Sequence, residues 1–257
     1  MRTAPASNGA RFAARPLAAG GTPARDWVAA LHRQALPPLD LADCQGLIVV
    51  APHPDDETLG FGATAAQLAA AGVDVRVVCV TDGGAAEPEA SLTDQVRLET
   101  VRRSELRRAT DLLSVPAPMS LGLPDGRLIE HEDRLAELLA GVLGAAAPGT
   151  WCAATWRGDG HPDHEAVGRA AAAACERTGI PLLEYPVWMW HWASPGDAVV
   201  PWQHAYAVPA PAWAIQRKRD AAQCFSSQFE VSSDGAPPVL PSFVLQRLLA
   251  VGEVVFR

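Results

Sequence analysis

The sequence predicts one α/β domain with a Rossmann-like, mainly parallel sheet flanked by helices, and three observations support this fold class. Short apolar runs, several of them β-branched, alternate along the chain with helical stretches of ten or more residues, as in βαβ units. Apolar residues make up 49% of the chain and charged residues 19%, which is the composition of a globular domain. No internal repeat or linker divides residues 40–257, so we expect a single domain.

The N-terminal part carries the weakest pattern. Residues 1–24 are rich in Ala, Gly, Pro and Arg without periodicity, and we expect a flexible tail there. The domain would then comprise residues 25–257. Its first element is a short helix over 27–34, which ends before the two prolines at 37–38.

The regular part of the chain begins with two strands around a helix. The run GLIVVA at 46–51 is continuous and apolar, as expected of a strand covered on both faces. A helix over 59–71 ends at Gly72, because glycine commonly follows a helix C-terminus, and a second strand follows over 73–81. The remaining expected elements are a helix over 92–113, a strand over 119–123, a helix over 131–143, a strand over 150–155, a helix over 164–177 and a strand that opens at 181.

The segment YPVWMWHWASPGD at 185–197 is unusually rich in tryptophan. In an extended conformation Trp188, Trp190 and Trp192 would project to one face of the strand. Such a face can form a platform for a sugar ring or an apolar ligand group. The same residues could instead pack against the edge of the domain or at an oligomer interface, so both interpretations stay open.

Charge and cysteine usage exclude several classes of protein. The formal net charge of −8 gives no support to nucleic-acid binding, because a phosphate backbone attracts a basic face. The arginines within 102–108 are interleaved with Glu99 and Glu105, which favours a solvated, salt-bridged helix face. The five cysteines are dispersed and contain no CxxC pair, so we predict neither a disulfide framework nor a thiolate zinc site.

The chain also lacks the patterns of a membrane or secreted protein. No window approaches the ~18 continuous apolar residues that a bilayer span requires. The Arg-containing N-terminus has no apolar region of the kind found in signal peptides. We therefore expect a cytoplasmic protein without membrane insertion.

Three polar loops follow predicted strands. They are PHPDDE at 52–57, TDGG at 81–84 and GDGHPDH at 158–164. In parallel α/β sheets, ligands bind at the carboxyl ends of the strands. We therefore expect these loops to converge at one edge of the sheet.

A dinucleotide site is one hypothesis for the first loop. Gly60, Gly62 and Ala65 have the form G-x-G-x-x-A, and Asp82 ends the next strand where a ribose-binding acid would lie. However, eight residues separate the strand from Gly60, and the acids at 55–57 would repel a pyrophosphate. We therefore regard this as a minor alternative.

A divalent metal site accounts better for a histidine beside clustered acids. Carboxylate oxygen and imidazole nitrogen are zinc ligands, and a catalytic site needs three of them. One turn can direct both His53 and Asp56 to the same ion, which leaves Asp55 free to act as a base. A third ligand would come from HPDH at 161–164, where His161 and His164 are both candidates.

The two His-Pro-Asp motifs together resemble the PIG-L/LmbE-like family of zinc-dependent N-deacetylases. The resemblance rests on PHPDDE at 52–57 and HPDH at 161–164, and it covers roughly residues 46–230. Further segments fall in the family's order: TDGG at 81–84, RRSE at 102–105, LGLPDG at 121–126 and KRDAAQCFSSQ at 218–228.

The resemblance implies specific roles at the first motif and its partner. It assigns the metal to His53, Asp56 and His164. It makes Asp55 the general base that takes a proton from the attacking water. The metal would be Zn²⁺, although a His₂Asp site also accommodates Fe²⁺ or another divalent ion.

The resemblance implies further roles around these ligands. His161 would be protonated and would stabilise the oxyanion or protonate the leaving amine. Asp163 would hold the His161 ring. Arg102 and Asp125 would contact polar groups of the substrate.

The implied activity is removal of an N-acetyl group from an N-acetylglucosamine-type amino sugar in a soluble small-molecule conjugate. One alternative is an amidase that cleaves a bulkier acyl group, of the mycothiol-conjugate type. Another is a non-catalytic sugar- or metal-binding protein, although binding alone would require neither Asp55 nor His161. The expected partner is the small-molecule substrate, and a homo-oligomer is compatible with the sequence.

Overall fold

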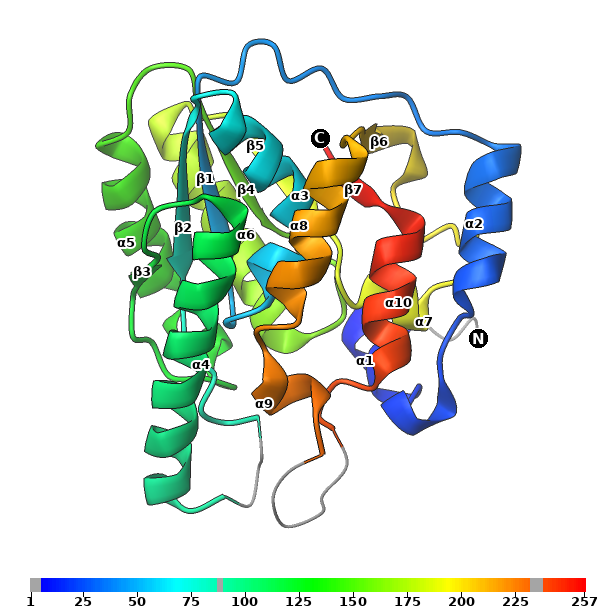
Figure 1. The fold of residues 1–257 in the computed structure, drawn as a ribbon, viewed down its shortest axis with the longest axis horizontal. Coiled ribbons are helices and arrows are strands. Elements are labelled where there is room, and N and C mark those ends of the chain that lie inside the picture. The colour runs from blue at the N-terminus through cyan, green and yellow to red at the C-terminus, as the bar shows by residue number, and fades with distance from the viewer. Residues whose placement is uncertain (1–5, 87–89, 232–237) are drawn as a thin grey trace, which may run out of the picture.

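A mixed, mainly parallel sheet forms the centre of the molecule (Figure 1). The computed structural model describes residues 6–86, 90–231 and 238–257. Within them seven strands pair in the order β3-β2-β1-β4-β5-β7-β6. The five strands from β3 to β5 are parallel, and β7 runs antiparallel to both neighbours. The strands are β1 (Gly46–Ala51), β2 (Asp74–Cys79), β3 (Met119–Ser120), β4 (Thr150–Thr155), β5 (Leu182–Tyr185), β6 (Ala205–Val208) and β7 (Glu253–Phe256).

Helices cover both faces of this sheet, as the alternating pattern predicted. One core lies between the sheet and α3, α4 and α8, and contains Phe61, Leu106 and Leu113. The other lies beneath α5 and α6 and contains Leu135 and Val167. These helices are α3 (Asp56–Ala70), α4 (Leu92–Leu113), α5 (Glu132–Gly144), α6 (Pro162–Thr178) and α8 (Ala212–Ala222). Smaller elements are η2 (Leu128–His131), η3 (Trp202–His204), α9 (Ser226–Phe229) and α10 (Ser242–Val251).

The three polar loops lie at the carboxyl ends of three adjacent strands. β1 is hydrogen-bonded between β2 and β4, with Gly46 opposite Asp74 on one side and Thr150 on the other. Because the three strands are parallel and in register, the loops after them leave the same edge of the sheet. This arrangement confirms the predicted α/β class and places the sequence motifs side by side.

The N-terminal segment differs from the expected flexible tail. Residues 1–5 lie outside the described residues, but α1 (Asn8–Ala13), η1 (Leu17–Ala19) and α2 (Ala24–Arg33) follow. Thr22, within the expected tail, is buried, and its N–H donates to the His191 carbonyl at 3.0 Å. Composition indicated a tail because long-range packing of this kind leaves no periodic signal in the sequence.

The tryptophan-rich segment is not an extended strand, so the expectation that its indoles share one strand face is wrong. β5 ends at Tyr185, and α7 (Met189–Trp192) follows after a short turn. The side chains of Trp190 and Trp192 are buried in the core. Asp159 causes this turn, because its carboxylate accepts the backbone N–H groups of residues 187, 188 and 189.

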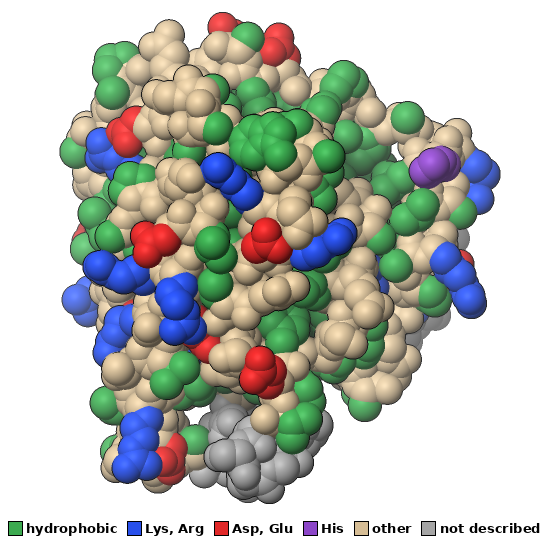
Figure 2. Space-filling view, viewed as in Figure 1, with side chains coloured by type: hydrophobic (Ala, Val, Ile, Leu, Met, Phe, Trp, Pro, Cys, Tyr) green, Lys and Arg blue, Asp and Glu red, His purple; other side chains and the backbone are tan. Residues whose placement is uncertain are grey.

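On the face formed by α4 and α8, positive and negative side chains are interspersed (Figure 2). The predicted solvated arginine face holds only in part. Arg103 is exposed and pairs with Asp82, but Arg102 is buried and turns toward the β1–α3 loop. In the described part of the chain, none of the helices combines the length and apolar character that crossing a bilayer would need.

Candidate active site

The turn between β1 and α3 has an unusual backbone. Asp55 adopts a φ of 135°, which a residue with a side chain rarely does and which costs about 1–3 kcal/mol. Two contacts hold it there. The Asp55 N–H donates to the Glu57 carboxylate at 3.1 Å, and the Arg102 guanidinium donates to the Pro54 carbonyl at 2.7 Å. Strain maintained by buried contacts is typical of a functional site.

This turn brings three candidate metal ligands together. Ligand atoms of His53, Asp56 and His164 all lie within 4.8 Å of one another. The Asp56 Oδ2 atom is 3.1 Å from His53 Nδ1 and 3.2 Å from His164 Nε2. His164 comes from the first turn of α6, where Pro162 occupies a favourable first helical position. A turn after β1 and a helix after β4 therefore meet at one point.

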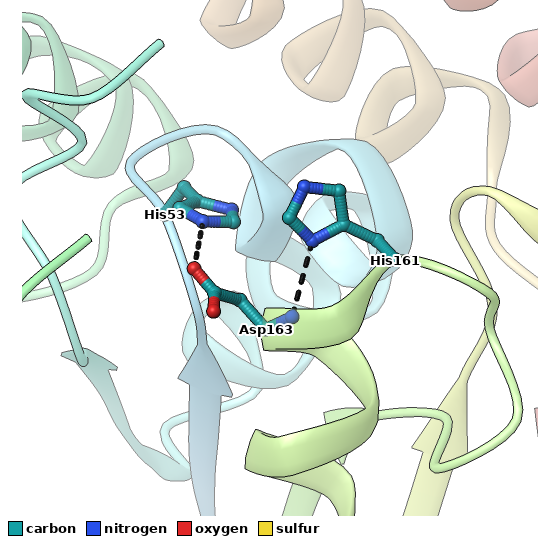
Figure 3. Close-up of side chains that lie close together, drawn as sticks. All are labelled: His53, His161 and Asp163. Carbon is teal, nitrogen blue, oxygen red and sulfur yellow. Dashed lines mark hydrogen bonds and ion pairs between the residues drawn. The ribbon is translucent and has the colours of Figure 1, made fainter. Parts of the chain in front are cut away.

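Asp163 and His161 are arranged differently from the expectation (Figure 3). The Asp163 carboxylate lies 3.2 Å from His53 Nε2 and accepts the backbone N–H groups of Gly126 and Leu128. Its contact with His161 is made by the backbone, because the Asp163 N–H points to His161 Nδ1 at 3.3 Å. The carboxylate thus supports the His53 ring, whereas the main chain orients His161.

The surroundings of His161 favour its neutral form. Burial and the neighbouring rings of His164 and His53 lower the pKa of His161 to about 3, so the ring is neutral at pH 7. Because Nδ1 accepts a backbone N–H, the proton of the neutral ring is on Nε2. The cationic His161 that the resemblance implied is therefore not the form that this structure favours.

Asp55 is a buried carboxylate beside a buried arginine. Burial raises the pKa of Asp55 to about 8, with Arg102 opposing and Asp56 and Glu57 adding to the increase. The Arg102 Nη2 atom lies 3.2 Å from the Asp55 carboxylate, and Nη1 donates to the Gly83 carbonyl at 3.1 Å. Asp55 is therefore held in place and has an unusual affinity for a proton.

Asp125 joins the same cluster from the loop after β3. Its Oδ1 atom is 3.0 Å from His53 Nε2, and its other oxygen accepts the Ala85 N–H at 2.8 Å. Asp125 and Asp163 therefore both face the side of His53 that is opposite Asp56. Carboxylates in this position orient a ligating imidazole.

These residues line a cavity of about 320 Å³ that opens at the carboxyl edge of the sheet. Its lining includes His53, Asp55, Asp56, His161 and His164, together with Arg102, Asp125 and Gly126. The sequence-predicted site residues are thus gathered in one place, with Asp163 outside the cavity lining but in contact with His53.

The comparison with known families agrees with this geometry. Residues 48–175, which contain both His-Pro-Asp motifs, match the sequence model of PIG-L, described as GlcNAc-PI de-N-acetylase. The chain belongs to the PIG-L family. The matched region runs from β1 into α6 and includes the loops that carry the three candidate ligands.

Curated PIG-L relatives are similar over part of the chain. The probable N-acetyl-alpha-D-glucosaminyl L-malate deacetylase 2 of Bacillus cereus is 31% identical over 144 residues, covering 55% of this chain and 64% of the relative. The 1D-myo-inositol 2-acetamido-2-deoxy-alpha-D-glucopyranoside deacetylase of Mycobacterium sp. strain KMS is 34% identical over 156 residues, covering 51% of this chain and 50% of the relative. The chain thus spans less than two thirds of the length of either relative.

A solved structure supports the fold over a longer stretch. A conserved protein of Thermus thermophilus has a TM-score of 0.54 and 26% identity, and the match covers 79% of this chain and 84% of that one. The architecture is therefore shared with a protein of known structure.

The donor set of this PIG-L site fits a divalent cation. His164 Nε2 is buried and makes no hydrogen bond to any part of the chain that the structure describes, although it faces Asp56 at 3.2 Å. Burial would lower the pKa of His164, but Asp56 and Asp159 raise it to about 9, which shows how strongly the surroundings favour positive charge. A cation would supply that charge and give the orphaned nitrogen a partner.

Asp159 is a site residue that sequence reasoning missed. It is fully buried, and its Oδ2 atom lies 2.8 Å from His164 Nδ1, on the side of the ring away from Asp56. The available signal was an acid five residues before His164 in GDGHPDH, a spacing that also fits an ordinary loop residue. Asp159 thus fixes the orientation of a candidate ligand and the start of α7 at once.

Asp159→Asn is expected to weaken metal affinity by roughly 10–100-fold, because it removes the charge that orients the His164 ring. Isothermal titration of the metal-free protein with Zn²⁺ measures the change. Asp74→Asn, at an exposed position on β2, serves as the matched control. Unchanged affinity in a folded Asp159→Asn variant would contradict this role.

Proposed function

We propose that this chain is a metal-dependent hydrolase that removes the N-acetyl group from an N-acetylglucosamine-type amino sugar in a small-molecule conjugate. The observation that carries the proposal is the group of His53, Asp56 and His164 with Asp55 beside it in one cavity. The names of the two curated relatives support it, because both describe deacetylases of glucosaminyl conjugates.

His53, Asp56 and His164 would hold the metal, and we propose zinc, because two imidazoles and one carboxylate form a common catalytic set. When bound, such an ion polarises the amide carbonyl and lowers the pKa of water. Asp125 and Asp163 keep His53 in position, and Asp159 does the same for His164.

Asp55 acts as the general base. Its buried carboxylate has a raised pKa and lines the cavity next to the ligand Asp56, so it is suited to accept the proton of the attacking water. Arg102 stabilises the ionised form and keeps the strained turn in place. The proton then passes to the leaving amine.

His161 stabilises the oxyanion through its Nε2–H group. A neutral donor can serve here because a preformed hydrogen bond to the developing negative charge lowers the barrier in a site shielded from water. The backbone N–H of Asp163 fixes the required tautomer. Arg102 and Asp125 line the wall where we place the sugar hydroxyls.

Metal analysis combined with product analysis tests the proposal. The purified protein is expected to bind about one divalent ion per chain and to release acetate from N-acetylglucosaminyl compounds. Chelation should abolish turnover, and Zn²⁺ should restore it. Full activity without metal would refute the proposal, and release of a larger acid in place of acetate would favour the amidase alternative.

A further inference from the structure

One wall of the cavity is apolar and is built partly by the N-terminal segment, defined here as residues 7–22. Phe12 and Leu17 of this segment line the cavity, together with Val187 and Trp188 before α7. Leu240, just before α10, and Val244, in its first turn, also line the cavity. The Phe12 and Trp188 rings are 5.2 Å apart between centroids, and Phe12 is 6.2 Å from the His161 ring.

The N-terminal segment is tied to the loop that carries His161. Asn8 donates its side-chain amide N–H to the Gly158 carbonyl at 2.8 Å. Gly160 has a φ of +94°, and a Cβ there would lie only 2.6 Å from Trp192 Nε1 and 3.0 Å from Phe12 Cβ. The glycine therefore permits α1 to pack directly on this turn.

A second set of contacts holds the other end of the segment. Thr22 donates its N–H to the His191 carbonyl at 3.0 Å, and its hydroxyl donates to the Ala193 carbonyl at 2.5 Å. The buried Arg247 of α10 donates to the Gly20 carbonyl. The segment is thus anchored at both ends, and Phe12 and Leu17 lie between the anchors as a fixed wall.

The lining of the cavity combines polar and apolar side chains. Arg102 and Asp125 give the lining polar groups suited to sugar hydroxyls. Phe12, Leu17 and Val244 contribute apolar carbon to the same lining. Phe12 and Leu17 are half-buried and line the same cavity as the buried candidate ligands Asp56 and His164. An acetyl group bound at the candidate metal ligands is small and would cover only part of this apolar lining.

We propose that the substrate carries an apolar aglycone, aromatic or branched, which binds the wall formed by Phe12, Leu17, Trp188 and Val244. This proposal rests on the proposed function, because it assumes an acetyl group at the metal. The remaining apolar surface then belongs to the part of the conjugate that extends outward from the sugar. Phe12 and Leu17 are specificity-determining residues in this arrangement.

The rate of N-deacetylation of two glycosides that differ only in their aglycone tests the proposal. We compare phenyl and methyl β-glycosides of N-acetylglucosamine with wild-type enzyme and with Phe12→Ala. The wild type is expected to favour the phenyl glycoside in kcat/KM by about tenfold or more, since burying an apolar group is worth that much in a pocket. Phe12→Ala should lower this ratio by about tenfold.

Two further variants separate recognition from folding. Val244→Ala probes the same wall from α10 and should also lower the ratio. Leu112→Ala, at a half-exposed position on α4 outside the cavity, should leave it unchanged. Equal kcat/KM of the wild type for both glycosides would overturn the proposal. It would also be overturned if Phe12→Ala and Val244→Ala each lowered kcat/KM by the same factor for the phenyl and the methyl glycoside.

Two outcomes distinguish this proposal from the proposed function. A preference for N-benzoyl over N-acetyl methyl glycoside would place the apolar group on the acyl side and overturn the aglycone assignment. If neither glycoside is deacetylated, their affinities for the protein, measured by calorimetry, still test the apolar wall. Binding of the aglycone by the wall would be supported if the phenyl glycoside bound more tightly than the methyl glycoside and if Phe12→Ala removed this difference. Equal binding of the two glycosides by the wild type would refute it.

Discussion

Asp55→Asn is expected to retain the metal and to lower kcat by about 10²–10⁴-fold, the usual contribution of a general base. Asparagine is the appropriate substitution because it tolerates a positive φ better than most residues, and Asp55 has a φ of 135°. The variant also leaves the bond from Arg102 to the Pro54 carbonyl intact. Acetate release and metal content of the same preparation measure both quantities.

The pH profile gives an independent test of the same base. Asp55 acts only when ionised, so kcat/KM of the wild type should rise with pH through its pKa. Burial raises that pKa to about 8 in the metal-free chain, and a bound cation lowers it again. The apparent pKa of the acid limb of this profile should therefore fall between the ordinary carboxylate pKa of ~3.9 and about 8.

Controls for Asp55→Asn separate a catalytic effect from loss of metal. Asp26→Asn, on the exposed side of α2, should behave as wild type. Asp56→Asn should lose both metal and activity, because it removes a ligand. Near-normal turnover in Asp55→Asn, or loss of its metal, would show that Asp55 is not the base.

The sequence was sufficient to predict the fold and the gathering of the candidate ligands. His53 and Asp56 lie in one turn, and His164 follows a strand that pairs with the same β1. Because parallel strands in register end at one edge, topology alone brings these residues together. The prediction depended only on local pattern and on strand order.

The details that failed depend on contacts between distant parts of the chain. The carboxylate of Asp163 turned to His53, which comes from another loop, and not to His161 two residues away. The tryptophan segment became helical because Asp159, about thirty residues earlier, binds its N–H groups. Neither contact leaves a periodic or spacing signal, so sequence reasoning could not find it.

The glycines near the first motif also have a role that the sequence pattern alone does not reveal. The sequence pattern Gly60-x-Gly62 allowed a dinucleotide interpretation. In the structure a Cβ at Gly60 would lie 2.2 Å from the Tyr185 ring, so the residue permits α3 to approach β5 closely. This packing role is distinct from phosphate binding, although one sequence pattern is compatible with both.

Glu253→Ala is expected to lower the free energy of unfolding by about 3–5 kcal/mol, because it leaves a buried lysine without its counter-charge. Glu253 and Lys218 are both buried and lie 2.9 Å apart. The carboxylate also accepts the backbone N–H groups of Ala63 and Thr64, each at 2.8 Å, and the Thr64 hydroxyl. Glu253 thus joins β7, α8 and the middle of α3.

Urea unfolding with matched variants identifies the cause of this loss. Asp74→Ala removes an exposed partner of Arg76 and should change stability little, since surface pairs contribute at most about 1 kcal/mol. The double variant Lys218→Met/Glu253→Gln should recover much of the loss, because it removes both charges and retains an acceptor for α3. If Glu253→Ala cost no more than Asp74→Ala, the buried pair would not be what holds α3, and with it the Asp55–Asp56 turn, against the C-terminal strand.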